Sequence, residues 1–132
     1  MSDFTEIERD GIAVQFVRVP DAIEHIRRAW DELEAVVALR GRHFYGVFDP
    51  IANDYRACVE VRDSDALVDG LESGTLPGGR YLRARLQGEP PAVYEQIGPT
   101  IDAMKRERTP DQSRPVLEYY RRHDEIDLLL PI

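Results

Sequence analysis

Residues 113–132 read Ser-Arg-Pro-Val-Leu-Glu-Tyr-Tyr-Arg-Arg-His-Asp-Glu-Ile-Asp-Leu-Leu-Leu-Pro-Ile, two extended runs joined by a short charged turn. Side chains alternate across a strand, so Val116, Glu118 and Tyr120 share one face of the first run. Glu118 therefore takes a place where an apolar residue is usual. It lies either in water on an exposed face or at the floor of a pocket with aromatic neighbours, and the function depends on which is true.

The preceding segments show further strand patterns. Residues 12–19 are rich in β-branched side chains, and 42–48, 55–61 and 80–86 are predicted to be strands as well. The segment 62–79 is less regular, with one possible helical turn in 63–70 and a short edge strand in 71–77. The sequence Pro77-Gly78-Gly79 marks a break before the next strand.

Two segments have helical periodicity. Apolar residues recur every three or four positions between Pro20 and Gly41, and again after Pro91. The buried faces are predicted to hold Ile23, Ile26, Trp30, Leu33 and Val37 in the first helix, and Val93, Ile97, Ile101 and Met104 in the second. Because Gly98-Pro99 falls inside the second pattern, we expect a kink or a break there.

The elements thus run β-α-β-β, a linker, then β-α-β-β, with units at about 12–61 and 80–131. We predict one α+β domain over residues 1–132, in which duplicated units pair about a pseudo-twofold axis. Antiparallel sheets then carry helices on one face, and the uncovered faces meet or form a central pocket. The alternative is a chance order of elements without duplication. In the duplicated fold, Phe44 and Phe48 lie on the strand that matches the one carrying Glu118.

Charge and composition exclude several classes of protein. The chain has 132 residues and a formal net charge of −8, which disfavours direct binding to nucleic acid over a broad surface. The single cysteine, Cys58, rules out an internal disulfide and fits a reducing compartment. The acidic start does not resemble a signal peptide, and no apolar run reaches the ~20 residues of a membrane span. We expect a cytoplasmic monomer or homodimer that does not bind membranes.

Several short motifs, taken in order, resemble the GyrI-like small-molecule (effector) binding domains over residues 12–132. These motifs are Glu118-x-Tyr120 after Arg114-Pro115, the ending 126–132, Ala29-Trp30 with Leu33, Tyr55-x-x-Cys58-Val59, Leu76-Pro77-x-Gly79-x-Tyr81, and Gly88. The resemblance implies a duplicated β-α-β-β fold with a central pocket that binds cationic, aromatic compounds against a glutamate. Glu118 matches that glutamate and Tyr120 matches the tyrosine two residues on. Leu117 stands where many members have tryptophan, which puts the size and shape of the ligand in doubt.

Three functions follow from the resemblance and the residues. The first is a freestanding binder of aromatic or cationic compounds with Glu118 as anchor and no cofactor. The second is a hydrolase of cyclopropane-type electrophiles, in which Glu118 is the general base and Tyr120 holds the leaving oxygen. The third, on family analogy alone, is an inhibitor that contacts a topoisomerase. Regulators of this type also carry a DNA-binding helical domain, for which we expect no room here.

The candidate ligand-binding residues are Glu118, Tyr120, Tyr55, Tyr81, Phe44 and Phe48. Burial among aromatic side chains should raise the pKa of Glu118, unless Arg83 or Arg85 pairs with it from a neighbouring strand. Trp30 on its helical stripe is predicted to belong to the core, and core packing is also the alternative role for any single tyrosine. His25, His43 and His123 have no metal-ligand spacing with one another or with Cys58, so no metal site is predicted. Cys58 itself is expected to be a small buried hydrophobic residue.

Overall fold

The computed structural model describes residues 4–37, 41–49, 52–62 and 66–132, which form both strands and helices. In chain order the elements are β1 (Thr5–Arg9), β2 (Ile12–Pro20), α1 (Ile23–Val36), β3 (Phe44–Asp49), β4 (Asp54–Glu60), β5 (Glu72–Leu76), β6 (Gly79–Gln87), α2 (Ala92–Glu95), α3 (Ile97–Glu107), β7 (Val116–Arg122) and β8 (Glu125–Pro131). The predicted strands at 12–19, 42–48, 55–61, 71–77 and 80–86 are confirmed as β2, β3, β4, β5 and β6.

Three features differ from the sequence prediction. Strand β1 was not predicted, because its short, largely charged sequence shows little apolar alternation. The second helix breaks at Gln96, ahead of Gly98-Pro99, since proline is tolerated in the first turn of α3. Residues 66–70 form no helical turn, and the rest of that prediction, 63–65, lies outside the described residues.

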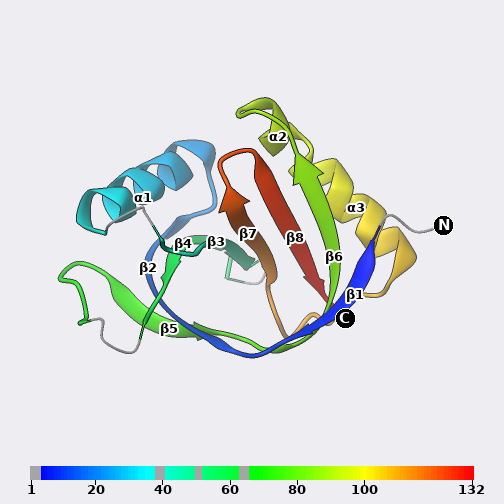
Figure 1. Cartoon of the computed structure of the whole chain (residues 1–132), viewed down its shortest axis with the longest axis horizontal. Helices are drawn as coiled ribbons and strands as arrows, with labels where there is room; N and C mark the ends of the chain where they lie inside the picture. The colour runs from blue at the N-terminus through cyan, green and yellow to red at the C-terminus, as the bar shows by residue number, and fades with distance from the viewer. Residues whose placement is uncertain (1–3, 38–40, 50–51, 63–65) are drawn as a thin grey trace.

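One antiparallel sheet holds the described strands in the order β1-β6-β8-β7-β3-β4-β2-β5, and it curls on itself (Figure 1). The strands of residues 12–60 form the run β3-β4-β2, and those of residues 79–131 form the run β6-β8-β7. The two runs meet where β3 pairs with β7. The fold is therefore α+β as predicted, while duplication and a central pocket stay predictions.

The two ends of the sheet belong to one continuous ribbon. β1 leads into β2 and β5 leads into β6, and the register is the same along the whole ribbon, with Thr5 opposite Arg83 and Phe16 opposite Glu72. Gly78 lies at the bend, where a Cβ atom would come within 2.7 Å of a backbone nitrogen of the facing strand. Only glycine fits such a close approach of two backbones.

The long helices cover one face of the sheet (Figure 1). Helix α1 lies on β2 and β4 and buries Ala29 and Leu33, whereas α3 lies on β8 and β6 and buries Met104. The apolar stripes predicted for the helices are therefore the faces that pack on the sheet. None of the described helices is long and apolar enough to cross a membrane.

The helix-free face of the sheet closes on its own core. Tyr45, Leu117 and Leu129 from the middle strands pack there against ribbon residues such as Leu76 and Tyr81, and each of these side chains is buried. The curl of the sheet thus brings its middle strands and its ribbon together around these apolar side chains. Because this space holds an apolar core, a site for a polar ligand has to lie on the helix-bearing face.

Arg114 ties the chain end to the ribbon. Its Nη2 donates hydrogen bonds to the backbone oxygens of Arg80 at 3.1 Å and Ile132 at 3.0 Å, and its Nε donates to Asp111 at 3.1 Å. The guanidinium also lies over the ring of Tyr81, 4.9 Å from its centroid. A planar group with several donors is needed to reach these partners at once.

We expect Arg114→Lys to lower the free energy of unfolding by about 2 kcal/mol, because a lysine ammonium cannot keep all of these bonds. Urea denaturation measures the change. The matched control is Arg108→Lys, which alters only an exposed ion pair with Glu6 and should change stability by less than about 0.5 kcal/mol. Equal effects of the two variants would contradict the role of Arg114.

Candidate functional site

Glu118 lies in the middle of the sheet, on the helix-bearing face. Strand β7 is an interior strand, and Glu118 is opposite Gly46 of β3 and Leu128 of β8. Its neighbours on the same face of β7, Val116 and Tyr120, pack with the cluster under α3. The residue is half-buried.

Two tyrosine hydroxyls hold the carboxylate. Tyr120 donates a hydrogen bond to Oε1 of Glu118 at 2.7 Å, and Tyr55 of β4 donates to the same oxygen at 3.1 Å. The indole Nε1 of Trp30 in turn donates to the hydroxyl oxygen of Tyr55 at 3.2 Å. A chain of hydrogen bonds thus runs from α1 through β4 to β7.

Gly46 makes room for this arrangement. A Cβ atom at Gly46 would lie 2.5 Å from Oε1 of Glu118 and closer still to the hydroxyl oxygen of Tyr55. The carboxylate and the phenol occupy the volume that any larger residue at this position would need. Because Gly46 has no side chain, the Tyr55 hydroxyl can reach across β3 to Glu118.

Aromatic rings surround the carboxylate on the helix-bearing face. Trp30 packs edge-to-face on Tyr120, with centroids 5.3 Å apart, and on Phe44, at 6.3 Å. Phe44 and Phe48 flank Gly46 on β3 and pack with the cluster under α1. The site thus includes Trp30 of α1, a residue that the sequence analysis assigned to the core.

Burial disfavours the charge on Glu118. Desolvation raises its pKa above the ordinary value, the hydrogen bonds from Tyr120 and Tyr55 oppose this shift, and the negative charge of Asp21 adds to it. The raised pKa agrees with the prediction from the sequence. Desolvation also raises the pKa values of Tyr55 and Tyr120 well above normal, so both phenols stay protonated and act as donors at neutral pH.

The alternative prediction was that Arg83 or Arg85 forms an ion pair with Glu118. Arg85 instead bonds through Nε to Asp127 at 2.8 Å. Arg83 lies on the same face of β6 as Arg85. This is the face opposite Leu82 and Leu86, which pack in the core under α3. Among the residues that the structure describes, no lysine, arginine or histidine forms an ion pair with Glu118.

The structure brings five of the six predicted ligand-binding residues together: Glu118, Tyr120, Tyr55, Phe44 and Phe48. The sixth, Tyr81, lies in the core of the helix-free face and donates its hydroxyl to the backbone oxygen of Pro77 at 2.6 Å. Its place on β6, between Arg80 and Leu82, puts it on the opposite face from Leu82.

Trp30 is the residue that sequence reasoning missed at this site. A half-buried tryptophan needs an acceptor for its N–H group, and that requirement was the available signal. Cys58, by contrast, is buried as predicted, and burial raises the pKa of its thiol to about 12. A thiol that stays protonated is no nucleophile at neutral pH.

Comparison with known proteins identifies the fold and leaves the family open. No family model matches the chain, and no curated protein matches it in sequence. An integron cassette protein from the mobile metagenome of Vibrio cholerae superposes with a TM-score of 0.75 at 16% identity, over 97% of this chain and 94% of that one. SAV2435 bound to tetraphenylphosphonium gives 0.68 at 14% identity, over 97% and 92%.

The C-terminal domain of EcmrR also superposes with a TM-score of 0.68, at 11% identity, over 97% of this chain and 95% of that one. At such identities the likeness shows the fold alone. It is consistent with the effector-binding fold that the sequence motifs resemble.

The raised pKa of Glu118 predicts a pH-dependent stability difference from Glu118→Gln. Between the ordinary pKa near 4.5 and the raised value, the folded state binds more protons than the unfolded state, so ionisation of Glu118 destabilises the fold as the pH rises. The neutral glutamine avoids this cost. We expect Glu118→Gln to be the more stable protein at pH 7, and the difference to shrink as the pH falls from the raised pKa toward 4.5 and to stay constant at lower pH.

Urea denaturation of both proteins between pH 4 and pH 8 measures the difference. The control is Glu34→Gln, which removes a charge from an exposed position of α1. A wild type that gains stability relative to Glu118→Gln as the pH rises would contradict the shift.

Proposed function

We propose that this chain binds small aromatic cations on the helix-bearing face of its sheet, with Glu118 as the electrostatic anchor. The observation that carries the proposal is the carboxylate of the partly buried Glu118, to which the residues that the structure describes offer only neutral hydrogen-bond donors. A desolvated anion without a counter-charge is costly, and a bound cation supplies the missing charge.

The two oxygens of Glu118 have different environments. Both tyrosine hydroxyls bond to Oε1, and no donor among the described residues bonds to Oε2. Oε2 is therefore the oxygen that faces a ligand. A cation 5 Å from it would gain about 3 kcal/mol at an effective dielectric constant near 20, equivalent to roughly 100-fold in affinity.

The aromatic side chains supply the second part of the recognition. Trp30, Tyr120 and Phe44 surround the carboxylate, and aromatic faces attract cations by about 0.5–2 kcal/mol each. Tetraphenylphosphonium, the molecule bound to the similarly folded SAV2435, combines a positive charge with four aromatic rings. This analogy supports the ligand class, while the ligand-binding residues proposed here come from the geometry of this chain.

We expect wild-type protein to bind tetraphenylphosphonium, and Glu118→Gln to bind it about 10- to 100-fold more weakly. Gly46→Ala should weaken binding as well, because its Cβ atom displaces Tyr55 and Glu118 without changing any charge. Isothermal titration calorimetry at 0.15 M salt measures the affinities, and Trp30, as the single tryptophan, gives an independent fluorescence signal.

Glu34→Gln is the matched control, since it removes the same charge from the exposed side of α1. Its affinity should stay within about twofold of wild type, because salt screens distant surface charges. Equal affinities of wild type and Glu118→Gln would disprove the anchor role of the carboxylate.

A second candidate function is hydrolysis of cyclopropane-type electrophiles. The favouring observation is a carboxylate with raised pKa beside a protonated phenol, Tyr120. Ionised Glu118 would take a proton from water while the water oxygen attacks the ring carbon. The ring C–C bond breaks and its electron pair moves to a conjugated oxygen, which takes a proton from solvent. The Tyr120 hydroxyl, released from Glu118 when that carboxylate takes up the proton of the water, donates a hydrogen bond to this oxygen.

If this second function holds, wild type forms ring-opened product from a cyclopropane-bearing alkylator, and Glu118→Gln loses about 10²- to 10⁴-fold in rate. Product is followed by mass spectrometry, with Glu34→Gln as the control. A rate in wild type no higher than in Glu118→Gln excludes the enzymatic function and leaves the binding function in place.

A further inference from the structure

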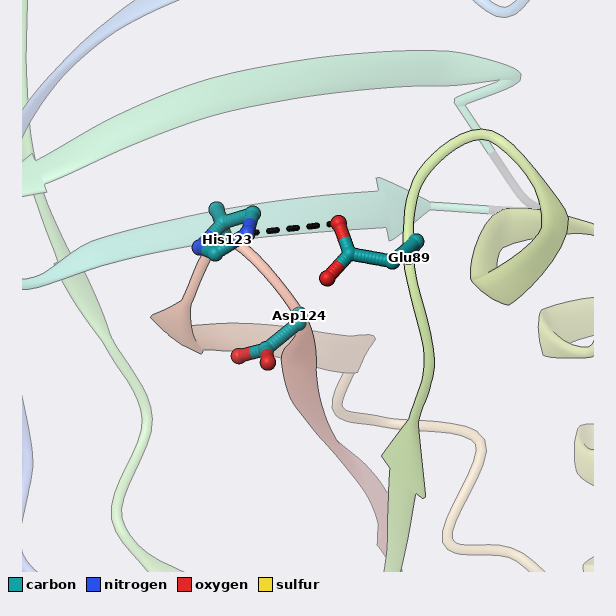
Figure 2. Close-up of side chains that lie close together, drawn as sticks. All are labelled: Glu89, His123 and Asp124. Atoms are coloured by element: carbon teal, nitrogen blue, oxygen red, sulfur yellow. Dashed lines mark ion pairs between the residues drawn. The ribbon is translucent and has the colours of Figure 1, made fainter.

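The fold brings a histidine and two carboxylates together at the end of the sheet remote from the ribbon bend. His123 and Asp124 form the turn between β7 and β8, and Glu89 follows β6 in the loop before α2. Figure 2 shows Glu89 reaching from its loop toward the imidazole of His123, with Asp124 next in the same turn. The spacing of histidines and Cys58 in the sequence does not indicate this group, because two of its three members are carboxylates.

The backbone fixes the two loops relative to each other. Gln87 pairs with Glu125 in the ladder between β6 and β8, and the amide of Gly88 donates to the backbone oxygen of Asp124 at 2.9 Å. The side chain of Gln87 also donates to Glu125 at 3.0 Å. The ligand-bearing residues are therefore held side by side by main-chain hydrogen bonds that do not depend on their own side chains.

The side-chain atoms are close enough to share one ion. Nε2 of His123 lies 3.4 Å from Oε2 of Glu89, and one ligand atom from each of the three residues lies within 4.8 Å of the other two. An ion bound at about 2.0–2.2 Å from nitrogen and oxygen donors needs donor separations of roughly 3–3.5 Å. The exposed side chains of Glu89 and His123 are free to make this small adjustment.

We propose that Glu89, His123 and Asp124 bind a divalent transition-metal ion, with zinc as the first ion to test. An imidazole with two carboxylates suits zinc better than magnesium or calcium, which prefer oxygen ligands alone. Asp124 also lines a surface cavity of about 240 Å³ with Gln87, Arg122 and Glu125.

A bound ion would join the β7–β8 turn to the loop before α2. Strand β7 carries Glu118 at its centre, so the ion would fix one end of the strand that holds the proposed binding site. The metal site nevertheless stands on its own residues, and it holds whether or not the aromatic-cation function is correct.

The chain offers a matched control for the test. His43 faces Glu60 with Nδ1 2.7 Å from Oε2, so it forms a tighter histidine–carboxylate pair that belongs to no three-residue group found in the described chain. If two ligands were enough, the His43 pair would bind zinc as well as the proposed site.

Calorimetric titration of tag-free protein with zinc chloride, in a buffer that does not chelate, should give one site in wild type. His123→Gln, Glu89→Gln and Asp124→Asn should each weaken binding by more than about tenfold, whereas His43→Gln should bind as wild type does. Zinc should raise the thermal midpoint of wild type and of His43→Gln but not of His123→Gln. Circular dichroism checks that each variant is folded.

Absence of zinc binding in wild type overturns the proposal. Wild-type affinity for zinc in Glu89→Gln or Asp124→Asn overturns the proposal too, because the substituted carboxylate is then not a ligand of the ion. Loss of binding in His43→Gln with retention in His123→Gln places the site at the other histidine and overturns this one.

Discussion

The pairing of β3 with β7 is the constraint on which the rest of the structure depends. It joins two parts of the chain that are far apart in sequence, and it sets Gly46 opposite Glu118. On the other face of the same two strands, Tyr45 stacks on Tyr119 with centroids 4.7 Å apart and helps to close the core. One register therefore determines both the composition of the candidate site and the packing beneath it. A slip of one residue would turn Glu118 into the apolar face, where its charge has no partner.

The candidate site keeps a carboxylate in a state that the fold itself does not favour. Desolvation acts against the charge, and two phenols that cannot ionise at neutral pH partly compensate through hydrogen bonds. Evolution could have placed an arginine beside Glu118, as it did for Asp127 with Arg85 on the other face. The contrast separates a structural ion pair, satisfied within the protein, from a carboxylate that has no basic partner in the described part of the chain.

Periodicity in the sequence predicted most elements, and alternation placed Tyr120 on the same face as Glu118. Phe44 and Phe48 were predicted from the assumed duplication, and Tyr55 from the family resemblance. The sequence did not show which face of the sheet the helices cover. For that reason Tyr81 was predicted to bind ligand, although it lies in the core of the helix-free face. The hydrogen bond from Trp30 to Tyr55 and the close contact at Gly46 depend on how strands pair. Strand pairing is non-local, and a single sequence carries no direct signal of it. The grouping of Glu89 with His123 depends on strand pairing for the same reason.

The continuous ribbon also bears on how the chain becomes structured. Thr5 pairs with Arg83, and Gly46 pairs with Glu118, so neither pair can form while the intervening chain is still being synthesised. Domains dominated by such distant pairings fold slowly, in about milliseconds to seconds, because long loops must close before contacts stabilise them. Of the described strands, β1 is synthesised before the others, and its partner β6 follows more than 60 residues later. The nascent chain therefore exposes unpaired strand edges throughout its synthesis, which is the stage at which chaperones protect such chains from aggregation.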